Sequence, residues 1–440
     1  VGSRKAGIIM QRTFAIFLLS SLSLWSMPTL EMGLNEILMV TSKQNLSIKQ
    51  ARNSFEIADN SASLANAGLL PRLDLSSGST LINGINQTPA GEVDVENTSL
   101  SAGLNGSYTL FNGMQGLTKY QLLNTQAQAS ELQSDMIEEN ILLSAANLYV
   151  NVLLRFDNLQ ISLEQVGISR QRLDQALEQT ERGMGTSLSA LAAQVDFDND
   201  SVSVIESEYA LQEAKRNLNL LVGWDLNQDY QPRSLSYELG SYDLQMLTSE
   251  GKKANKSHAL NLNLEKQTDL NMKRTLGSVL PRVSLSGSYG LQQVNPDVDF
   301  SFDNPDMTTT AGLSLSWNLF DGMKSKSIQS GRLLQKNSEW NTLDSKRELD
   351  KSLSSALAYY EKSRQILELK ANTLSSAHLN FDQTQEYFRL GQVSSTQFRD
   401  AQLNLSRAKS SQIQARYSAY LAEMSLWQLT GQLKEKALSI

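Results

Sequence analysis

Apolar and polar residues alternate with a period of two in two distant parts of the chain. Between residues 99 and 111, one face of an extended chain would hold Leu100, Ala102, Leu104, Gly106, Tyr108 and Leu110. Residues 310–319 repeat the pattern with Ala311, Leu313, Leu315, Trp317 and Leu319, and residues 282–292 repeat it with Val283, Leu285, Tyr289 and Leu291. The opposite faces are mainly serine, threonine, asparagine and glycine, so the pattern predicts strands covered on one side only.

A second periodicity, of three and four residues, follows each strand region. Residues 115–181 contain no proline and only two glycines, and their apolar residues step along one helical face through Ile137, Ile141, Ala145, Leu148, Val152, Phe156, Leu159, Leu163 and Val166. Residues 324–388 do the same through Leu349, Leu353, Tyr360, Leu367, Leu374 and Phe381. Each pattern predicts one amphipathic helix, about 100 Å long at about 1.5 Å per residue.

Four shorter helical segments accompany these two long helices. They cover residues 34–68, 188–222, 243–278 and 396–430, each about half as long as a long helix. Two of them stacked end to end would match one long helix. This arithmetic predicts a hollow cylinder of helices rather than a globule.

The same order of strand and helix motifs occurs twice in the sequence. Leu70-Pro71-Arg72-Leu73 returns as Leu280-Pro281-Arg282-Val283, and Leu110-Phe111-Asn112-Gly113-Met114 returns as Leu319-Phe320-Asp321-Gly322-Met323. Gly183 and Gly223 have counterparts in Gly391 and Gly431, both 208 residues later. We therefore predict two structural repeats, over residues 28–232 and 233–440, with β-hairpins at 69–113 and 279–322.

The strands have the length and the flanking residues of membrane-spanning strands. They are about 10–13 residues long, Tyr108 and Trp317 sit near their ends where an aromatic girdle belongs, and the segments 83–97 and 295–307 read as polar exposed loops. Four strands cannot close a barrel, and open edges would face lipid. Two copies would give eight strands and three would give twelve, and only the latter leaves a lumen. We therefore predict a homotrimer in contact with membrane lipid.

Composition and charge narrow the class of protein further. The 440 residues carry a net charge of −7 with acidic and basic residues intermixed, which argues against nucleic acid as a partner. Cysteine is absent, which excludes disulfides and thiolate metal sites. Arg4, Lys5 and Arg12 precede an uncharged stretch that ends near Pro28, so we expect residues 1–27 to be a signal peptide.

With these residues in view, the chain resembles a TolC-family outer-membrane efflux or secretion channel. The resemblance covers essentially all of the chain after the expected signal peptide. The features that carry it are the strand starts 68–73 and 279–283, the strand ends 110–114 and 319–323, the turns 182–187 and 389–394, and an Ala-Gln pair after each turn at 193–194 and 401–402. Each motif is weak alone, but the duplicated set in this order is specific.

The resemblance implies a homotrimer with a 12-stranded barrel in the outer membrane of a Gram-negative bacterium and a helical tunnel through the periplasm. Substrates would pass through it passively, delivered by an inner-membrane RND, ABC or MFS pump or by a type I secretion system. The periplasmic adaptor of that pump would contact the helical tips. The positions that match the tips are Gly183, Met184, Gly185, Thr186, Gly391, Val393 and Ser394.

The resemblance also implies an acidic constriction just after the second tip. The family motif there is Asp-Val-Leu-Asp-Ala, and this chain has Gln397-Phe398-Arg399-Asp400-Ala401. Only Asp400 is retained, and Gln397 replaces the first aspartate. Three copies of Asp400 around one axis would attract cations, although Arg399 could offset their field. Ser189 and Val393 replace charged residues that form closing links in other members, so we expect closure to rest on helix packing and on Asp400.

An enzyme is not indicated. His258 and His378 are far apart, no phosphate-binding loop is present, and no cofactor or metal site is predicted. The spaced acids Asp196, Asp198 and Asp200 read as a solvated helix face. Two other interpretations remain at this point: an envelope coiled-coil scaffold without a conduit, which leaves the membrane-length strands unexplained, and an adaptor-like protein, for which two complete repeats are unusual.

Overall fold

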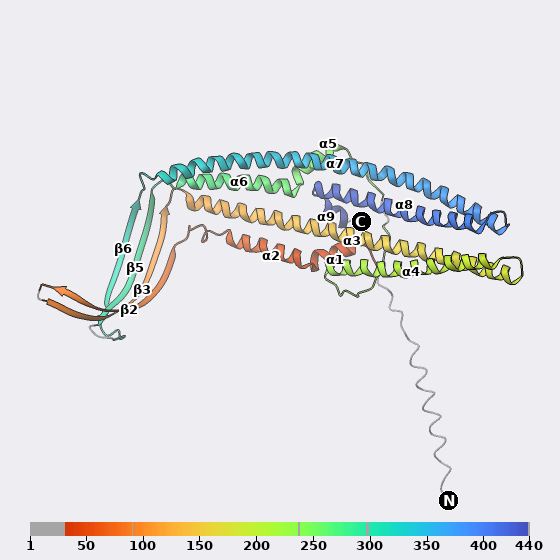
Figure 1. The fold of residues 1–440 in the computed structure, drawn as a ribbon. Coiled ribbons are helices and arrows are strands. Elements are labelled where there is room, and N and C mark those ends of the chain that lie inside the picture. The colour runs from red at the N-terminus through yellow and green to blue at the C-terminus, as the bar shows by residue number, and fades with distance from the viewer. Residues whose placement is uncertain (1–30, 90, 236–237, 296–298, 439–440) are drawn as a thin grey trace, which may run out of the picture.

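The molecule is elongated, with a sheet at one end and helical hairpins at the other (Figure 1). A computed structural model describes residues 31–438 except 90, 236–237 and 296–298. The expected signal peptide, residues 1–27, lies outside the described residues. Long helices lie side by side along the whole body, and a group of short elements lies about halfway along it.

One order of elements occurs twice along the chain. The first half has α1 (Leu34–Gln44), α2 (Leu46–Ser61), β2 (Arg72–Thr88), β3 (Gly91–Phe111), α3 (Gln115–Glu181) and α4 (Ser187–Val222). The second half has α5 (Leu244–Ala254), α6 (Lys256–Gly277), β5 (Arg282–Asn295), β6 (Asp306–Ser316), α7 (Gly322–Arg389) and α8 (Ser395–Leu429). The short elements β1 (Glu31–Met32), β4 (Gln231–Pro232) and α9 (Leu433–Leu438) complete the described chain.

The long helix α3 is the centre of the core. It packs against α2 and α6 in one half of the body and against α4 and α8 in the other. Because α3 has neighbours on two sides, the face that it buries is wider than the single apolar face predicted from the sequence. Ala145 and Val152 are fully buried as predicted, but so are Leu142, Tyr149 and Leu153, whereas the predicted Ile137 and Leu163 are exposed.

The predicted helices 34–68 and 243–278 are both wrong, because each is broken at an asparagine, and the first also ends at Ser61 instead of residue 68. Asn45 separates α1 from α2: its side-chain oxygen accepts hydrogen bonds from the backbone N–H groups of Ser47 and Ile48. Asn255 separates α5 from α6 in the same way, accepting from His258. Asparagine is a favoured N-cap because its side chain satisfies the free N–H groups of a new helix.

The same two asparagines join the shorter helices end to end. Asn45 Nδ2 donates to the carbonyl oxygen of Leu221 at the end of α4, 2.7 Å away, and Asn255 Nδ2 donates to that of Leu429 at the end of α8, 3.0 Å away. Thus α2 continues the line of α4 beside α3, and α6 continues the line of α8 beside α7 (Figure 1). The predicted end-to-end stacking is present, but it involves α2 and α6 without α1 and α5.

The sheet is antiparallel, with the strand order β2-β3-β5-β6. The pairing of β3 with β5 joins the two halves of the chain, and β2 and β6 form the edges. The predicted loop 83–97 is wrong: β2 and β3 have 17 and 21 residues and pair from Arg72–Ser107 to Thr88–Gly91. Conversely, β6 ends at Ser316, opposite the first residue of β5, so Trp317 and Leu319 have no strand to pair with and lie beyond it.

The short elements form a belt halfway along the helices. Strand β1 pairs in parallel with β4, and the buried hydroxyl of Tyr149 lies 2.8 Å and 2.7 Å from the carbonyl oxygens of Met32 and Arg233 on either side of this pair. Helix α9 packs on α1 and α8 through the buried Leu433 and Ala437. The belt was not visible in the hydrophobic pattern, because its strands have only two residues each.

Candidate functional site: the bare sheet and the helical tips

The two faces of the sheet differ in chemistry, and neither is covered by a helix (Figure 1). One face carries the apolar residues of the predicted alternation, with Leu75 82 % and Leu313 68 % exposed. The other carries serine, threonine, glycine and asparagine that bond across strands, as in the contacts Ser288 Oγ to Thr310 Oγ1 (2.6 Å) and Asn105 Nδ2 to Ser76 Oγ (3.1 Å). A contiguous bare apolar face needs an apolar environment, whereas the opposite face suits water.

The structure places Tyr108 and Trp317 at the end of the sheet that joins the helices. Tyr108 pairs with Leu285 three residues before the end of β3. Trp317 follows the last residue of β6, is exposed, and donates its indole N–H to the carbonyl oxygen of Val279, 3.1 Å away. Phe111 and Phe320 are exposed near the same end. The two residues therefore lie at one level of the molecule, each near the end of the second strand of its hairpin, Tyr108 in the first hairpin and Trp317 in the second.

In the sheet and in the row of helices alike, one outermost element comes from the first half of the chain and the other from the second half. In the sheet the edges are β2 and β6. Among the helices, the packing order is α2-α3-α6-α7 near the sheet and α4-α3-α8-α7 near the tips, so α2, α4 and α7 are the outer helices. One side of the molecule is thus formed by β2, α2 and α4, and the other by β6 and α7.

The outer helix α4 has an apolar seam that no other described part of the chain covers. Its exposed apolar residues follow a heptad spacing, namely Leu188, Leu191, Val195, Val202, Ile205 and Tyr209. Such a 3–4 spacing is the pattern by which two helices pack in a coiled coil. On the opposite side, α7 exposes Tyr359, Ile366 and Leu369 at spacings of seven and three.

The first helical tip connects α3 to α4. Gly183 has φ of +73°, a conformation that glycine adopts without steric strain. The N–H groups of Met184 and Gly185 both donate to the carbonyl oxygen of Gln179, and Thr186 caps α4 by accepting from the N–H of Ser189. Met184 is left 70 % exposed. The loop is therefore fixed by its backbone, and the Met184 side chain is available for contact.

The second tip connects α7 to α8. Gly391 has φ of +70°. Ser394 and Gln397 form a capping box: the N–H of Gln397 donates to Ser394 Oγ (3.2 Å), and the N–H of Ser394 donates to Gln397 Oε1 (2.8 Å). The Gln397 side chain therefore caps a helix, which the sequence did not predict. Val393 is half-buried, and Asp400, one turn into α8, is exposed.

A hydrogen bond joins the two hairpins near their tips. Arg172 Nη2, in α3, donates to Ser395 Oγ at the first residue of α8, 2.7 Å away. Arg172 lies nine residues before the end of α3, so the start of α8 is held beside the last turns of that helix.

Behind the tips lies a buried group of charges that we call the tip cluster, consisting of Arg172, Asp196, Asp200 and Arg399. Arg399 Nη1 and Nη2 lie 2.6 Å and 2.8 Å from the two oxygens of Asp200, and Arg172 Nη1 lies 3.1 Å from Asp196. Asp200 is only 2 % exposed. The prediction that these acids are solvated is therefore wrong for Asp200, whereas Asp196 is half-buried and paired and Asp198 is exposed.

Hydrogen bonds favour the charged forms of Asp200 and Arg399. Burial alone would raise the pKa of Asp200, but hydrogen bonds from Arg399, Ser169 and Gln165 outweigh burial and lower it. Burial likewise opposes the charge of Arg399, but its pairing with Asp200 raises the pKa of the guanidinium. The sequence did contain a signal for this cluster. Ala190, Ala193, Asp196 and Asp200 follow one another at helical spacing, and the two alanines are buried, so the two aspartates lie on the same face of α4.

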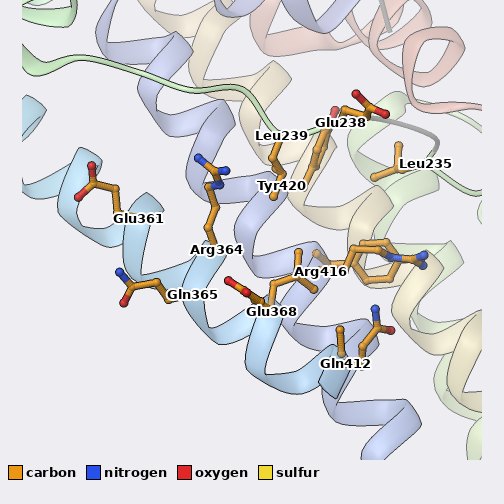
Figure 2. A pocket seen from close by; sticks show the side chains of 13 residues that line it. Leu235, Glu238, Leu239, Glu361, Arg364, Gln365, Glu368, Gln412, Arg416 and Tyr420 are labelled. Carbon is orange, nitrogen blue, oxygen red and sulfur yellow. The ribbon is translucent and has the colours of Figure 1, made fainter. Parts of the chain in front are cut away.

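A groove of about 870 Å³ lies between α7, α8 and the segment that precedes α5 (Figure 2). Glu361, Arg364 and Glu368 reach into it from α7, and Arg416 and Tyr420 from α8. Arg416 Nη2 is 3.5 Å from Asp157 of α3, so this charge is already paired. The described residues that line the groove include no serine, threonine, cysteine or histidine, so the groove holds none of the usual pairs of nucleophile and base.

Two negative findings apply to the part of the chain that the structure describes. It holds no group of three or more histidine, cysteine, aspartate or glutamate side chains able to bind a metal ion. None of its helices combines the length and apolarity needed to cross a membrane. His258 is buried beside Ser345, and His378 pairs with Asp382 on the surface of α7.

This arrangement of helices and sheet is the fold of outer-membrane channels. The crystal structure of the CmeC outer membrane channel of Campylobacter jejuni superimposes with a TM-score of 0.76 at 17 % identity, covering 91 % of this chain and 86 % of that one. Among characterised sequences, the outer membrane efflux protein BepC of Brucella suis is 25 % identical over 97 % of this chain and 91 % of its own length. The outer membrane protein TolC of Escherichia coli is 21 % identical over 96 % and 87 %.

The sequence profile of the family described as outer membrane efflux protein matches residues 40–224 and 276–432. The chain therefore belongs to the outer membrane efflux protein family, and the resemblance to the TolC family found in the sequence is confirmed. It is a transport protein of the outer membrane and not an enzyme.

Proposed function

We propose that three copies of the chain close into one passage through the outer membrane and conduct exported substrates passively. The observation that carries this proposal is that the sheet has two edge strands, β2 and β6, without a partner among the described strands, and an apolar face that no described element covers. In lipid, the free N–H and C=O groups of both edges must find partners. The β6 edge of one copy can supply them to the β2 edge of the next.

Contacts of this head-to-tail kind form a ring when the rotation between copies closes. Two copies would give eight strands, a barrel that side chains fill, whereas three give twelve strands and leave a lumen. The same rotation brings α7 of one copy to α2 and α4 of the next. The apolar seam on α4 then packs against the exposed apolar residues of α7, which supports the trimer independently of the sheet.

Membrane contact would involve the apolar sheet face, with Tyr108 and Trp317 in the girdle at its helix end. Aromatic residues with a polar group favour the boundary between lipid and water. The small polar residues of the other sheet face would line the lumen. This division needs no rearrangement of the chain, because both faces already have the required chemistry.

The helical tips would contact a periplasmic adaptor of an inner-membrane RND, ABC or MFS pump or a type I secretion system. Their exposure supports this role: Met184 projects from the first tip, and Gly183, Gly185 and Thr186 build its loop. Gly391, Val393 and Ser394 build the second tip. Asp400 would form the cation-attracting constriction of the trimer, while Gln397 supports it by capping α8.

The test has two parts. Native mass spectrometry in mild detergent should give a mass three times that of the mature chain, and planar-bilayer recordings should show ion passage. In those recordings, Asp400→Asn should lower selectivity for cations over anions, because the constriction would lose its negative charge. A monomer, or a trimer that never conducts, would favour the scaffold interpretation instead.

A further inference from the structure

Arg399 and Asp400 are neighbours in sequence, yet their side chains point in different directions. A step of one residue turns about 100° around a helix. Asp400 shares the exposed face of α8 with Asn404 and Arg407, whereas Arg399 is directed into the tip cluster. Arg407 lies about 10 Å further along that face, at about 1.5 Å per residue. Asp400 is therefore the charged residue on this face of α8 that lies nearest the tip.

The charge of Arg399 is matched inside the protein. Both terminal nitrogens bind Asp200, and Nε lies 3.6 Å from Asp196, which also pairs with Arg172. The tip cluster holds two arginines and two aspartates, so its net charge is zero. Arg399 consequently contributes little field at Asp400, and the expectation that it offsets the charge of Asp400 is wrong for this arrangement.

Contacts on both sides of Arg399 fix how α8 is turned about its axis. Phe398 stacks on Phe388 of α7 with ring centroids 4.9 Å apart. The guanidinium of Arg172 lies 5.7 Å from the ring centroid of Phe398. Gln402 Nε2 donates to the carbonyl oxygen of Gln165 in α3, 3.1 Å away. The bidentate contact with Asp200 lies between these two and has the directional geometry of an arginine–carboxylate pair.

We propose that Asp200 is a positioning residue for the constriction: by binding both terminal nitrogens of Arg399, it holds that arginine and its charge away from Asp400. The inference rests on the proposed role of Asp400 as the constriction. It assigns ion selectivity partly to Asp200, a residue that is buried between helices and faces no passage. Without Asp200, Arg399 would lose both hydrogen bonds from its terminal nitrogens to a carboxylate and keep, among its contacts with carboxylates, only the 3.6 Å contact of Nε with Asp196, so its side chain could swing toward Asp400.

The test is the reversal potential of the full-length protein in planar bilayers under a KCl gradient. Asp200→Asn should lower the ratio of potassium to chloride permeability by about twofold or more, since an arginine released beside an acidic ring reduces its field. The double variant Asp200→Asn with Arg399→Gln should restore the ratio, because no unpaired charge remains. A residue with a merely structural role would not show this rescue.

Glu164→Gln is the matched control. It also removes one carboxylate from an ion pair with α8, because Glu164 of α3 lies 2.5 Å from Lys409, but that carboxylate is half-exposed. Exposed ion pairs contribute little, so the permeability ratio should not change. The proposal would be overturned if Asp200→Asn left the permeability ratio unchanged while Asp400→Asn lowered it. That result would leave the proposed constriction at Asp400 intact.

An Asp400→Asn variant without any effect would instead remove the constriction itself. Amide hydrogen exchange then still tests the clamp on α8. Asp200→Asn should accelerate exchange over residues 395–405 well beyond Glu164→Gln, because α8 loses its bidentate anchor. Equal exchange in the two variants would show that Asp200 does not hold α8, and the proposal would fail.

Discussion

At the scale of single residues, the tips depend on backbone conformations that only glycine adopts without strain. Gly391 has φ of +70°, and a side chain added there would meet no other atom within 4 Å. Any cost of substitution therefore comes from the backbone alone. Gly167 offers the opposite case, because it lies inside α3, also meets nothing within 4 Å, and has no positive φ.

We therefore expect opposite signs from two glycine-to-alanine changes. Gly391→Ala should destabilise the second tip by about 1–2 kcal/mol, the cost of a left-handed conformation for an L-residue. Gly167→Ala should stabilise α3 by about 1 kcal/mol, because alanine is the better helix former. Amide hydrogen exchange, read separately at the tip and along α3, distinguishes the two; a loss at both sites would contradict this account.

Two adjacent glutamates in α3 have opposite electrostatic environments. Burial raises the pKa of Glu139 from 4.5 to about 6, with Asp135 and Glu138 adding to the rise and Lys256 opposing it. Burial also acts on Glu138, but hydrogen bonds from Ser42, Lys434 and Arg52 outweigh it and lower the pKa. Glu138 thus joins α1, α2 and α9 to α3, whereas Glu139 has no such set of donors.

The pH dependence of stability follows from these directions. Between pH 4.5 and about 6 the folded chain holds a proton on Glu139 that the unfolded chain has released, so stability falls as pH rises through this interval. Glu139→Gln should therefore stabilise the protein by about 2 kcal/mol at pH 7 and by little at pH 4. Glu138→Gln should destabilise it at pH 7. Denaturant unfolding at both pH values measures the difference, and a stabilising Glu138→Gln would refute the assignment.

At the scale of elements, the long helices could be predicted closely because nothing interrupts their pattern. The sequence placed a helix over 115–181, and α3 covers Gln115–Glu181. The breaks at Asn45 and Asn255 could not be predicted, because an asparagine inside an apolar pattern is also compatible with a continuous helix. What decides its conformation is the carbonyl of Leu221 or Leu429, about 175 residues away in sequence.

The double role of Asn255 can be separated by two substitutions. Asn255→Ala removes both the cap and the bond to Leu429, and should cost about 1–2 kcal/mol. Asn255→Asp keeps the accepting oxygen of the cap but cannot donate to the Leu429 carbonyl, so it should retain part of that stability. Thermal unfolding measures both. If the aspartate variant were as unstable as the alanine variant, the cap would contribute nothing and the link between α6 and α8 would account for the whole loss.

At the scale of the whole molecule, the sequence predicted that the chain needs other copies, but not which surfaces they share. The four strands and their alternation were visible, whereas the order of the helices across the body depends on contacts between distant segments. The same limit applied to the tip cluster, because Asp200 and Arg399 are 199 residues apart. The turn glycines could be placed from the sequence, since a positive φ is a local requirement.

The seam on α4 gives a direct test of assembly. Ile205 is 66 % exposed in the single chain, so Ile205→Asp should leave the fold of the monomer intact while placing a charge in the packed interface of the proposed trimer. We expect the trimer to dissociate in mild detergent at a protein concentration where the unchanged protein stays assembled, as measured by native mass spectrometry. Ser203→Asp, also exposed on α4, is the control and should leave the mass unchanged.

The unequal strands of the sheet have one more consequence. Strand β3 pairs with β5 only from Thr98 onward, so residues 91–97 and their partners in β2 form a two-stranded ribbon beyond the rest of the sheet. At about 3.3 Å per residue, this ribbon adds some 20–25 Å. In the proposed orientation, with the tips in the periplasm, the ribbon would stand on the outside of the cell. A short epitope inserted at its turn should be recognised by antibody on intact bacteria, which would make this hairpin the part of the protein that the surroundings meet first.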